Sequence, residues 1–132
     1  MIYTFGITPV PQGRPRFVKR GAFVQTYDPK TSKEFKQTLK KLAVQQSPTL
    51  SESALEVSIV FHMSIPKSKP KKWREHPPAH TVKADIDNLV KSTLDALTGV
   101  LWKDDSQICT LHAHKEYSSN PRIELEVTDV GP

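Results

Sequence analysis

The chain has 132 residues, of which 36% are hydrophobic and 25% charged, and its net charge is +5. This length predicts one domain that can hold a core without a disulfide or a structural metal, and no apolar run approaches the roughly 18 residues of a membrane span. The single cysteine excludes an intrachain disulfide and a cysteine-clustered zinc site. Since the start also lacks the basic segment of a signal peptide, we expect a cytoplasmic protein.

Hydrophobic periodicity predicts a strand, a β-hairpin and a helix in the first third of the chain. These are a strand over residues 1–8, a hairpin of residues 14–20 and 22–27 about Gly21, and a helix from Thr31 or Ser32 to about Gln46. Alternate side chains such as Tyr3 and Phe5 share one side of the strand, and Phe35 and Leu39 share one side of the helix. The Asp28–Pro29 pair before the helix predicts a turn.

The rest of the chain predicts three further strands and a second helix. The strands cover residues 54–65, 107–117 and 122–129, and the helix covers residues 86–98. Residues 66–85 are rich in proline and lysine, so we expect no regular structure there; a loop this long is often functional. Strands outnumber helices, which favours an α+β fold: one small domain over residues 1–132, with a mixed sheet and two main helices.

Positive charge is concentrated before residue 85. Residues 1–84 hold 15 Lys and Arg against five acids, whereas residues 85–132 hold four against nine. This asymmetry suggests a polyanion such as DNA, although an ordinary solvated surface has the same composition. Cations surround Phe17 and Trp73, whose rings could stack on an unpaired base or pack inward. The candidate DNA-binding residues are Arg14, Arg16, Lys69, Lys71, Lys72, Trp73, Arg74 and Lys83.

Acidic residues between positions 85 and 105 are the strongest candidates for chemistry. We expect Asp85 in an extended lead-in and Asp87 in the first turn of the helix, with Lys91 one turn further on. Asp104 and Asp105 follow the helix after a turn, and we expect one of them to join the first pair. Carboxylates gathered in this way repel one another unless a cation such as Mg²⁺ binds, and a bound Mg²⁺ can activate water against a phosphodiester.

Simpler explanations exist for the same residues. The acids could be ordinary helix-start residues and a surface turn. The basic segment that runs directly into them favours a nuclease, because cations bind phosphates beside metal-binding carboxylates. His112 and His114 alternate on a predicted strand and could share a metal, but no third ligand is evident. We expect Cys109, on the same strand, in the core rather than as a nucleophile.

A signature of separate elements runs through this region in a fixed order. It consists of Asp85-Ile86-Asp87-Asn88-Leu89, Lys91, Asp95-Ala96-Leu97, Trp102 and Asp104-Asp105-Ser106-Gln107-Ile108. The pattern resembles that of the RusA family of Holliday junction resolvases, most closely over residues 83–117. The stretch PVPQGRPRF at residues 9–17 resembles a variant found in prophage-type members, and it differs from the asparagine-rich loop of other members.

This resemblance implies an α+β homodimer that needs Mg²⁺, which Mn²⁺ could replace. It implies paired symmetric nicks at a four-way DNA junction, in DNA recombination and repair. The family's essential acids correspond to Asp85, Asp87 and Asp105, with Asp104 as a substitute for Asp105. Its essential lysine corresponds to Lys91, and Asn88 fits the motif as a supporting residue.

Two other functions fit the same residues. A nuclease with these acids could prefer another branched DNA, such as a flap or a replication fork. A DNA-binding protein without catalysis would use the acids structurally and would show salt-dependent binding without Mg²⁺-dependent nicking. Comparing cleavage rates across branched substrates separates the two nucleases, and incubation of a labelled four-way junction and a matched duplex with and without Mg²⁺ separates a nuclease from a non-catalytic protein.

Overall fold

A mixed four-stranded sheet forms the centre of the computed structural model, which describes residues 1–131 except 15, 22 and 28, and not the side chains of residues 16–18, 20 and 23–27. The strands are β1 (Ile2–Phe5), β4 (Ala54–Ser64), β5 (Ile108–Ser118) and β6 (Arg122–Gly131), in the order β1-β6-β4-β5. The β4 and β5 strands are parallel, and the other neighbours are antiparallel. The expected mixed sheet of an α+β domain is therefore confirmed.

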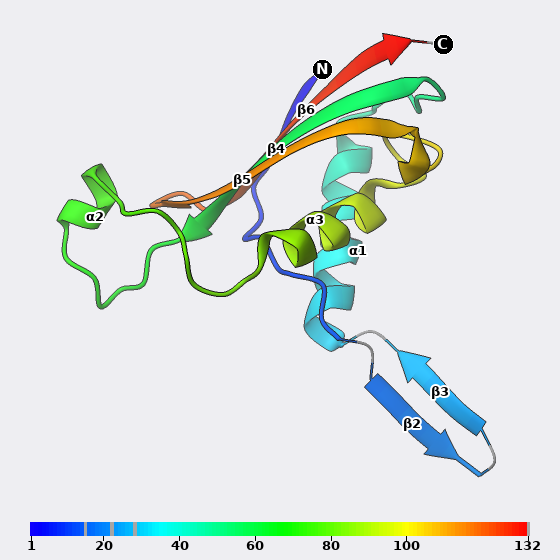
Figure 1. Cartoon of the computed structure of the whole chain (residues 1–132), viewed down its shortest axis with the longest axis horizontal. Coiled ribbons are helices and arrows are strands. Elements are labelled where there is room, and N and C mark those ends of the chain that lie inside the picture. The colour runs from blue at the N-terminus through cyan, green and yellow to red at the C-terminus, as the bar shows by residue number, and fades with distance from the viewer. Residues whose placement is uncertain (15, 22, 28, 132) are drawn as a thin grey trace.

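Two helices, α1 (Lys30–Gln45) and α3 (Ile86–Leu97), pack against each other and cover one face of this sheet (Figure 1). Alternate β4 side chains, including Val57 and Phe61, are fully buried under the helices, as the period of two predicts. Each such side chain contributes roughly 1.5–3 kcal/mol on burial. Within the described residues, neither these helices nor the short α2 is long and apolar enough to cross a membrane.

The first helix starts differently from our expectation. The residue before its first turn is Pro29, so Thr31 and Ser32 lie inside the helix rather than capping it. The Ser32 hydroxyl instead accepts a hydrogen bond from the Gly13 N–H at 2.8 Å. Proline suits this position, because a helix start has unpaired N–H groups and proline lacks one.

The hairpin of β2 (Arg16–Arg20) and β3 (Phe23–Tyr27) forms its own two-stranded sheet and projects beyond the start of α1 (Figure 1). Gly21 has a φ of 61° at its tip, a conformation that glycine adopts without strain. The hairpin expected from the sequence is therefore confirmed. The turn expected at Asp28–Pro29 includes residue 28, which lies outside the described residues.

The basic segment between β4 and α3 is mostly irregular, but it contains one helical turn, α2 (Lys72–Glu75). Our expectation of no regular structure is wrong at this point. The backbone N–H groups of Trp73 and His76 bond to the carbonyls of Pro70 and Lys72, so the turn forms between prolines. Pro77 and Pro78 follow it and cannot donate to a further helical turn.

The β5 strand is the outer strand of the sheet, and residues 109–114 along it are all exposed. Cys109 is among them, so our expectation that it lies in the core is wrong. The register between β4 and β5 shifts at Leu55 and Glu56, which pair with Ile108 and Thr110 and leave Cys109 unmatched. The thiol contacts the Leu55 carbonyl at 3.4 Å, and Cys109 is exposed together with residues 110–114 of this outer strand.

Candidate functional site

Two acidic residues stand at the start of α3. Asp85 precedes the first helical residue with an extended backbone, and Asp87 lies in the first turn, as expected from their spacing. Both side chains are exposed. Neither carboxylate has a hydrogen-bond or ion-pair partner among the described residues, and Asp85 does not cap its helix. Two exposed carboxylates at one helix start, without an ion-pair partner among the described residues, form a site that a hard divalent cation would stabilise.

Lys91 lies one turn further along α3, with its side chain 62% exposed. Its ammonium is 3.7 Å from Asp95 Oδ2, and Lys36 of α1 is 3.8 Å from the same oxygen. The i,i+4 pair therefore forms with Asp95 rather than with Asp87. Exposed pairs of this length contribute little stability, so Lys91 can leave Asp95 at low cost.

Asp104 and Asp105 lie beyond the other end of α3, at the 3₁₀ turn η1 (Asp105–Gln107). The Asp104 carboxylate accepts a hydrogen bond from the Ser106 N–H at 2.9 Å, and Gln107 Oε1 accepts one from the Asp104 N–H at 2.8 Å. The hydrogen bonds from Ser106 hold the pKa of Asp104 below its usual range. Asp104 thus caps the turn, whereas Asp105 is exposed within it, which favours Asp105 as the ligand.

The two groups of acids are far apart in one chain. The helix between them has 12 residues, which corresponds to a length of about 18 Å. The β5 strand gives a similar distance. It begins at Ile108, directly after η1, and Lys115, about 23 Å further along it, contacts Ala84, the residue before Asp85. In the described part of the chain, no three His, Cys, Asp or Glu side chains could hold one metal ion. The expected gathering of three carboxylates therefore does not occur within a single chain, because α3 separates them.

The N-terminal stretch approaches the start of α3. The Gln12 N–H donates to the Asn88 carbonyl at 2.8 Å, and Ser92 Oγ donates to the Val10 carbonyl at 2.6 Å. Only glycine fits at position 13, because a Cβ there would lie 2.6 Å from Pro29 Cγ. These contacts hold residues 10–13 beside the first turns of α3, and the exposed Arg14 follows directly in the chain.

Sequence reasoning identified the cations of this stretch but missed Gln12 and Ser92, the residues that anchor it. Arg16 follows in β2, and its side chain lies outside the described residues, as does that of Phe17. Asn88 contacts the stretch through its backbone carbonyl, which any residue could supply. Its proposed supporting role in the site therefore stays a prediction.

The aromatic residue of the basic loop packs on the protein. The ring of Trp73 is half-buried with its centroid 5.1 Å from that of Tyr117, and the Lys69 ammonium lies 5.1 Å from the Trp73 ring centroid. This contact favours the packing alternative for Trp73. The remaining candidate cations are exposed and have no ion-pair partner among the described residues: Lys71, Lys72, Arg74 and Lys83.

The end of the basic loop is fixed to β5. His80 is buried with its ring centroid 4.5 Å from that of Tyr117, and Ala79 forms a β-bridge to Glu116. Burial lowers the pKa of His80, and the nearby charge of Lys115 lowers it further. The loop that leads to Asp85 is therefore held by a neutral imidazole and by the end of β5.

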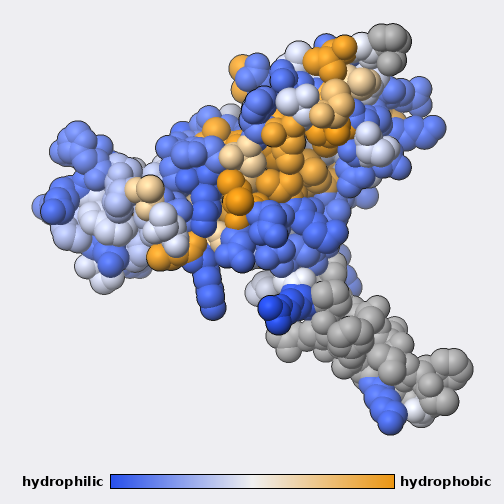
Figure 2. Space-filling model, in the orientation of Figure 1, coloured by the Kyte–Doolittle hydropathy of each residue, from blue (hydrophilic) through white to orange (hydrophobic). Residues whose placement is uncertain are grey.

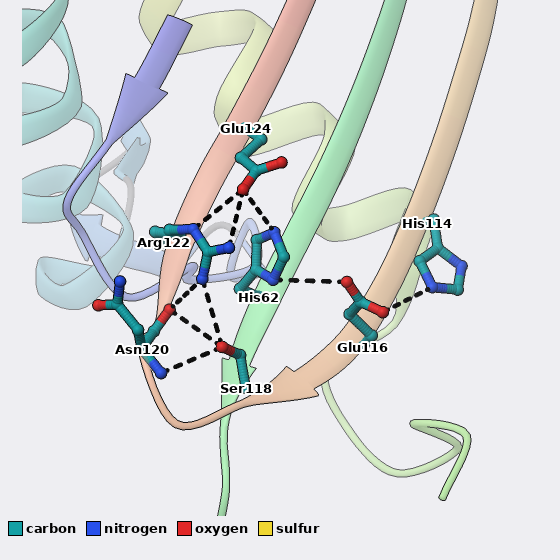
Figure 3. Close-up of polar contacts among 7 residues, drawn as sticks. All are labelled: His62, His114, Glu116, Ser118, Asn120, Arg122 and Glu124. Carbon is teal, nitrogen blue, oxygen red and sulfur yellow. Dashed lines mark hydrogen bonds and ion pairs between the residues drawn. The ribbon is translucent and has the colours of Figure 1, made fainter. Parts of the chain in front are cut away.

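The open face of the sheet carries a network of histidines, glutamates and an arginine, which sequence reasoning missed. Figure 3 shows His62 between Glu116 and Glu124, at 3.5 and 3.2 Å, with Arg122 2.8 Å from Glu124. His114 pairs with Glu116 on this face, and His112 pairs with Glu56. The two histidines thus face different glutamates and do not share a ligand position. The feature of the sequence that could have indicated this network is the alternation of Glu and His with apolar residues along β4, β5 and β6.

An α+β domain with exposed, unpaired carboxylates beside exposed cations is typical of a nuclease that uses a divalent metal. A family model described as "Endodeoxyribonuclease RusA" matches residues 6–128, and the chain belongs to this family. The resemblance seen in the acidic signature is therefore confirmed. The protein is an enzyme of the crossover junction endodeoxyribonuclease class, whose substrate is branched DNA.

Two relatives are similar over different shares of the chain. The uncharacterized protein YqaN of Bacillus subtilis (strain 168) is 36% identical over 129 residues, which cover 92% of this chain and 91% of the relative. The crossover junction endodeoxyribonuclease rusA of Lactococcus phage r1t is 38% identical over 77 residues, which cover 58% of this chain and 55% of that protein.

Proposed function

We propose that the protein is a Mg²⁺-dependent endonuclease that resolves four-way DNA junctions by paired symmetric nicks during recombination and repair. The observation that carries this proposal is the pair of exposed carboxylates, Asp85 and Asp87, which have no partner among the described residues at the start of α3. Their oxygens are the ligands that Mg²⁺ prefers, and Mn²⁺ could replace it. When bound, the ion supplies an activated water and neutralises charge on the scissile phosphate.

The candidate site residues then have the following roles. Asp85 and Asp87 would hold the ion with Asp105 as a third ligand, and Lys91 would leave Asp95 to bind a phosphate oxygen. Asp95 keeps its second partner, Lys36, so the departure of Lys91 does not leave an uncompensated carboxylate. Exposed cations of the loop and of the N-terminal stretch bind the DNA backbone around the site.

We propose further that two copies of the chain complete the site. Apart from the β-bridge between Glu116 and Ala79, the outer edge of β5 has no strand partner among the described residues, and an exposed edge readily pairs with another strand. Figure 2 shows apolar surface between β5 and α3 beside this edge. Apolar side chains that keep solvent contact on these two elements are Ile86, Val90, Leu94, Ile108, Leu111 and Ala113.

A two-fold axis through this edge would pair β5 with β5 of the second copy in antiparallel orientation. The start of one β5, which follows Asp105, would then lie near the end of the other, where Lys115 contacts the segment before Asp85. Asp105 of one copy would thus approach Asp85 and Asp87 of its partner. Two sites related by symmetry would suit the two symmetric strands of a junction.

The test is cleavage of a labelled four-way junction and of a matched duplex, with Mg²⁺, with Mn²⁺ and with EDTA. We expect paired nicks on the junction alone, and only with metal. Asp87→Asn and Asp105→Asn should each reduce cleavage by about a hundredfold or more, because each removes a metal ligand, while junction binding remains.

Asp104→Asn is the matched control, because asparagine also caps a helical turn and should keep most of the activity. Full activity of Asp87→Asn would refute the metal site. Faster cleavage of a flap or a fork than of the junction would assign another branched substrate. Binding of the junction without nicks under any metal would favour the non-catalytic hypothesis.

A further inference from the structure

Lys115 of β5 holds the segment of chain that leads into the acidic pair. Its ammonium donates hydrogen bonds to the carbonyls of Val82 and Ala84, both at 2.8 Å. Lys115 pairs in register with Phe61, whose side chain is buried under the helices. The lysine side chain therefore leaves the sheet on its helix-covered side, where the loop passes on its way to α3.

The position of Asp85 depends on this segment. Asp85 has an extended backbone, and its side chain makes no capping bond that would hold it to α3. Its carbonyl accepts the Leu89 N–H at 3.1 Å, which fixes only the helical side of the residue. The other side is fixed by the carbonyl of Ala84, the residue immediately before it, which Lys115 binds.

Other candidate anchors of this segment act further away. His80 and Trp73 pack on Tyr117, and Ala79 bridges to Glu116, but all three precede Thr81. Among the described residues, Lys115 is the only one whose side chain hydrogen-bonds the backbone between residues 81 and 84. The last fixed point before the acids is therefore the lysine ammonium.

We propose that Lys115 is a positioning residue for the metal-binding acids, because its two hydrogen bonds set the path of the chain into α3. The path determines the direction of the Asp85 carboxylate relative to that of Asp87. This inference rests on the proposed function, since it assigns the two acids to a metal ion. The lysine does not itself touch the ion or the scissile phosphate.

The test compares Lys115→Met, which removes the donors, with Lys115→Arg, which keeps a charged donor. Mn²⁺ binding is measured by electron paramagnetic resonance, without DNA, and the Mg²⁺ concentration for half-maximal junction cleavage is measured separately. Lys115→Met should weaken Mn²⁺ binding by about tenfold and raise the Mg²⁺ requirement similarly, as expected for a residue that orients a ligand. The rate at saturating Mg²⁺ and the junction affinity in EDTA should change by less than about twofold, and Lys115→Arg should recover most of the metal affinity.

Lys30→Met is the matched control, because Lys30 is an exposed lysine that pairs with Glu34 on α1, a helix that carries none of the metal-binding acids. It should leave both metal measurements unchanged. Hydrogen exchange provides a second readout: amides of residues 85–89 should exchange faster in Lys115→Met than in Lys30→Met. Should Lys115→Met fail to fold, Lys115→Gln replaces it under the same criteria.

Unchanged Mn²⁺ affinity in Lys115→Met would overturn the proposal. Loss of junction affinity in EDTA would also overturn it, since Lys115 would then contact DNA directly. Failure of the wild-type protein to bind Mn²⁺ or to cleave any branched DNA would instead refute the proposed function. Normal wild-type activity with an unaffected Lys115→Met variant would refute only the role of Lys115.

Discussion

The two ends of α3 carry acids from one sequence signature, but they are built in opposite ways. At the first end, Asp85 and Asp87 have no partners among the described residues. At the second, Asp104 is bound within its own turn by Ser106, and Gln107 ties the turn to the carbonyls of Ser51 and Ser53. One end leaves its carboxylates free for a ligand, whereas the other forms a rigid turn that presents Asp105.

The difference extends to what holds each end in place. The first end is held by distant parts of the chain, since Gln12 bonds to Asn88 and Lys115 bonds to the segment before Asp85. The second end forms hydrogen bonds within residues 104–107. Gln107 adds two hydrogen bonds to the carbonyls of Ser51 and Ser53, just before β4. A site that needs both ends must join them across about 18 Å, which the proposed pairing of two copies would do.

Mixing two inactive variants tests this comparison with the largest expected effect. Asp87→Asn and Asp105→Asn should each be inactive alone. In a mixed dimer with shared sites, one site would combine both substitutions, and the other would contain only native acids. At equal concentrations, up to about half of the dimers would be mixed. We therefore expect the mixture to recover junction nicking, with single rather than paired nicks because each mixed dimer has one native site.

The reverse experiment is a chain that carries both substitutions, mixed with the wild-type chain. If the sites are shared, each site of the mixed dimer contains one substitution, and the excess variant suppresses wild-type cleavage. If each site belongs to one chain, the mixed dimer keeps one native site, and the two single variants fail to complement each other. That pair of results would return all three acids to one chain.

A charge at the β5 edge should separate the copies. Leu111 is 40% exposed on this strand, and Leu111→Glu would bury a carboxylate between the copies. We expect the dimer dissociation constant to rise at least about tenfold, because an unpaired buried charge costs more than the roughly 1.4 kcal/mol of a tenfold change. Sedimentation velocity measures this change, and cleavage should fall with it.

Val130→Glu is the control for this substitution, because Val130 is 49% exposed but lies on β6, away from the β5 edge. It should leave both association and cleavage unchanged. A Leu111→Glu variant that remains dimeric would place the interface elsewhere. A monomeric variant with full activity would contradict the shared site.

Most of the fold could be predicted from the sequence, since its hydrophobic periods are regular. The alternation in β4 and the spacing in α3 gave both elements nearly to the residue. The failures have local causes. Pro29 precedes α1 where Thr31 or Ser32 was expected to cap it, and Cys109 lies on the outer strand β5, where residues 109–114 are exposed although a strand residue of this type was expected in the core.

The candidate site could be predicted only as a set of residues. The signature names Asp85, Asp87, Asp105 and Lys91, but residues close in sequence need not meet, and a helix of 12 residues keeps the acids apart. The residues that hold the first end lie in distant strands and loops. Lys115 and Gln12 donate hydrogen bonds to backbone carbonyls there. Because every residue has such a carbonyl, no residue type near the acids indicated these contacts.

The smallest expected effect is a difference between the two ends of α3 in mild acid. The pKa of His80 lies below its usual 6.5, chiefly because the ring is buried against Tyr117 and also because Lys115 is near. His80 therefore binds a proton more readily when its loop is detached from β5 than when the ring is packed on Tyr117. The stabilisation by His80 is complete above about pH 6.5 and declines as the pH falls below that value. The lowered pKa of Asp104 acts at the other end, where stabilisation is lost only as the pH falls through a value below 3.8.

Hydrogen exchange at pH 7 and pH 5.5, corrected for the intrinsic rate, measures both ends in one experiment. Amides of residues 79–84 should lose protection at the lower pH, while those of residues 104–107 should not. His80→Phe keeps a ring against Tyr117 and removes the titration, so its loop should show no such change. An equal loss of protection in His80→Phe would assign the pH dependence to other groups around the loop, such as His114 and Glu116, which line the same pocket.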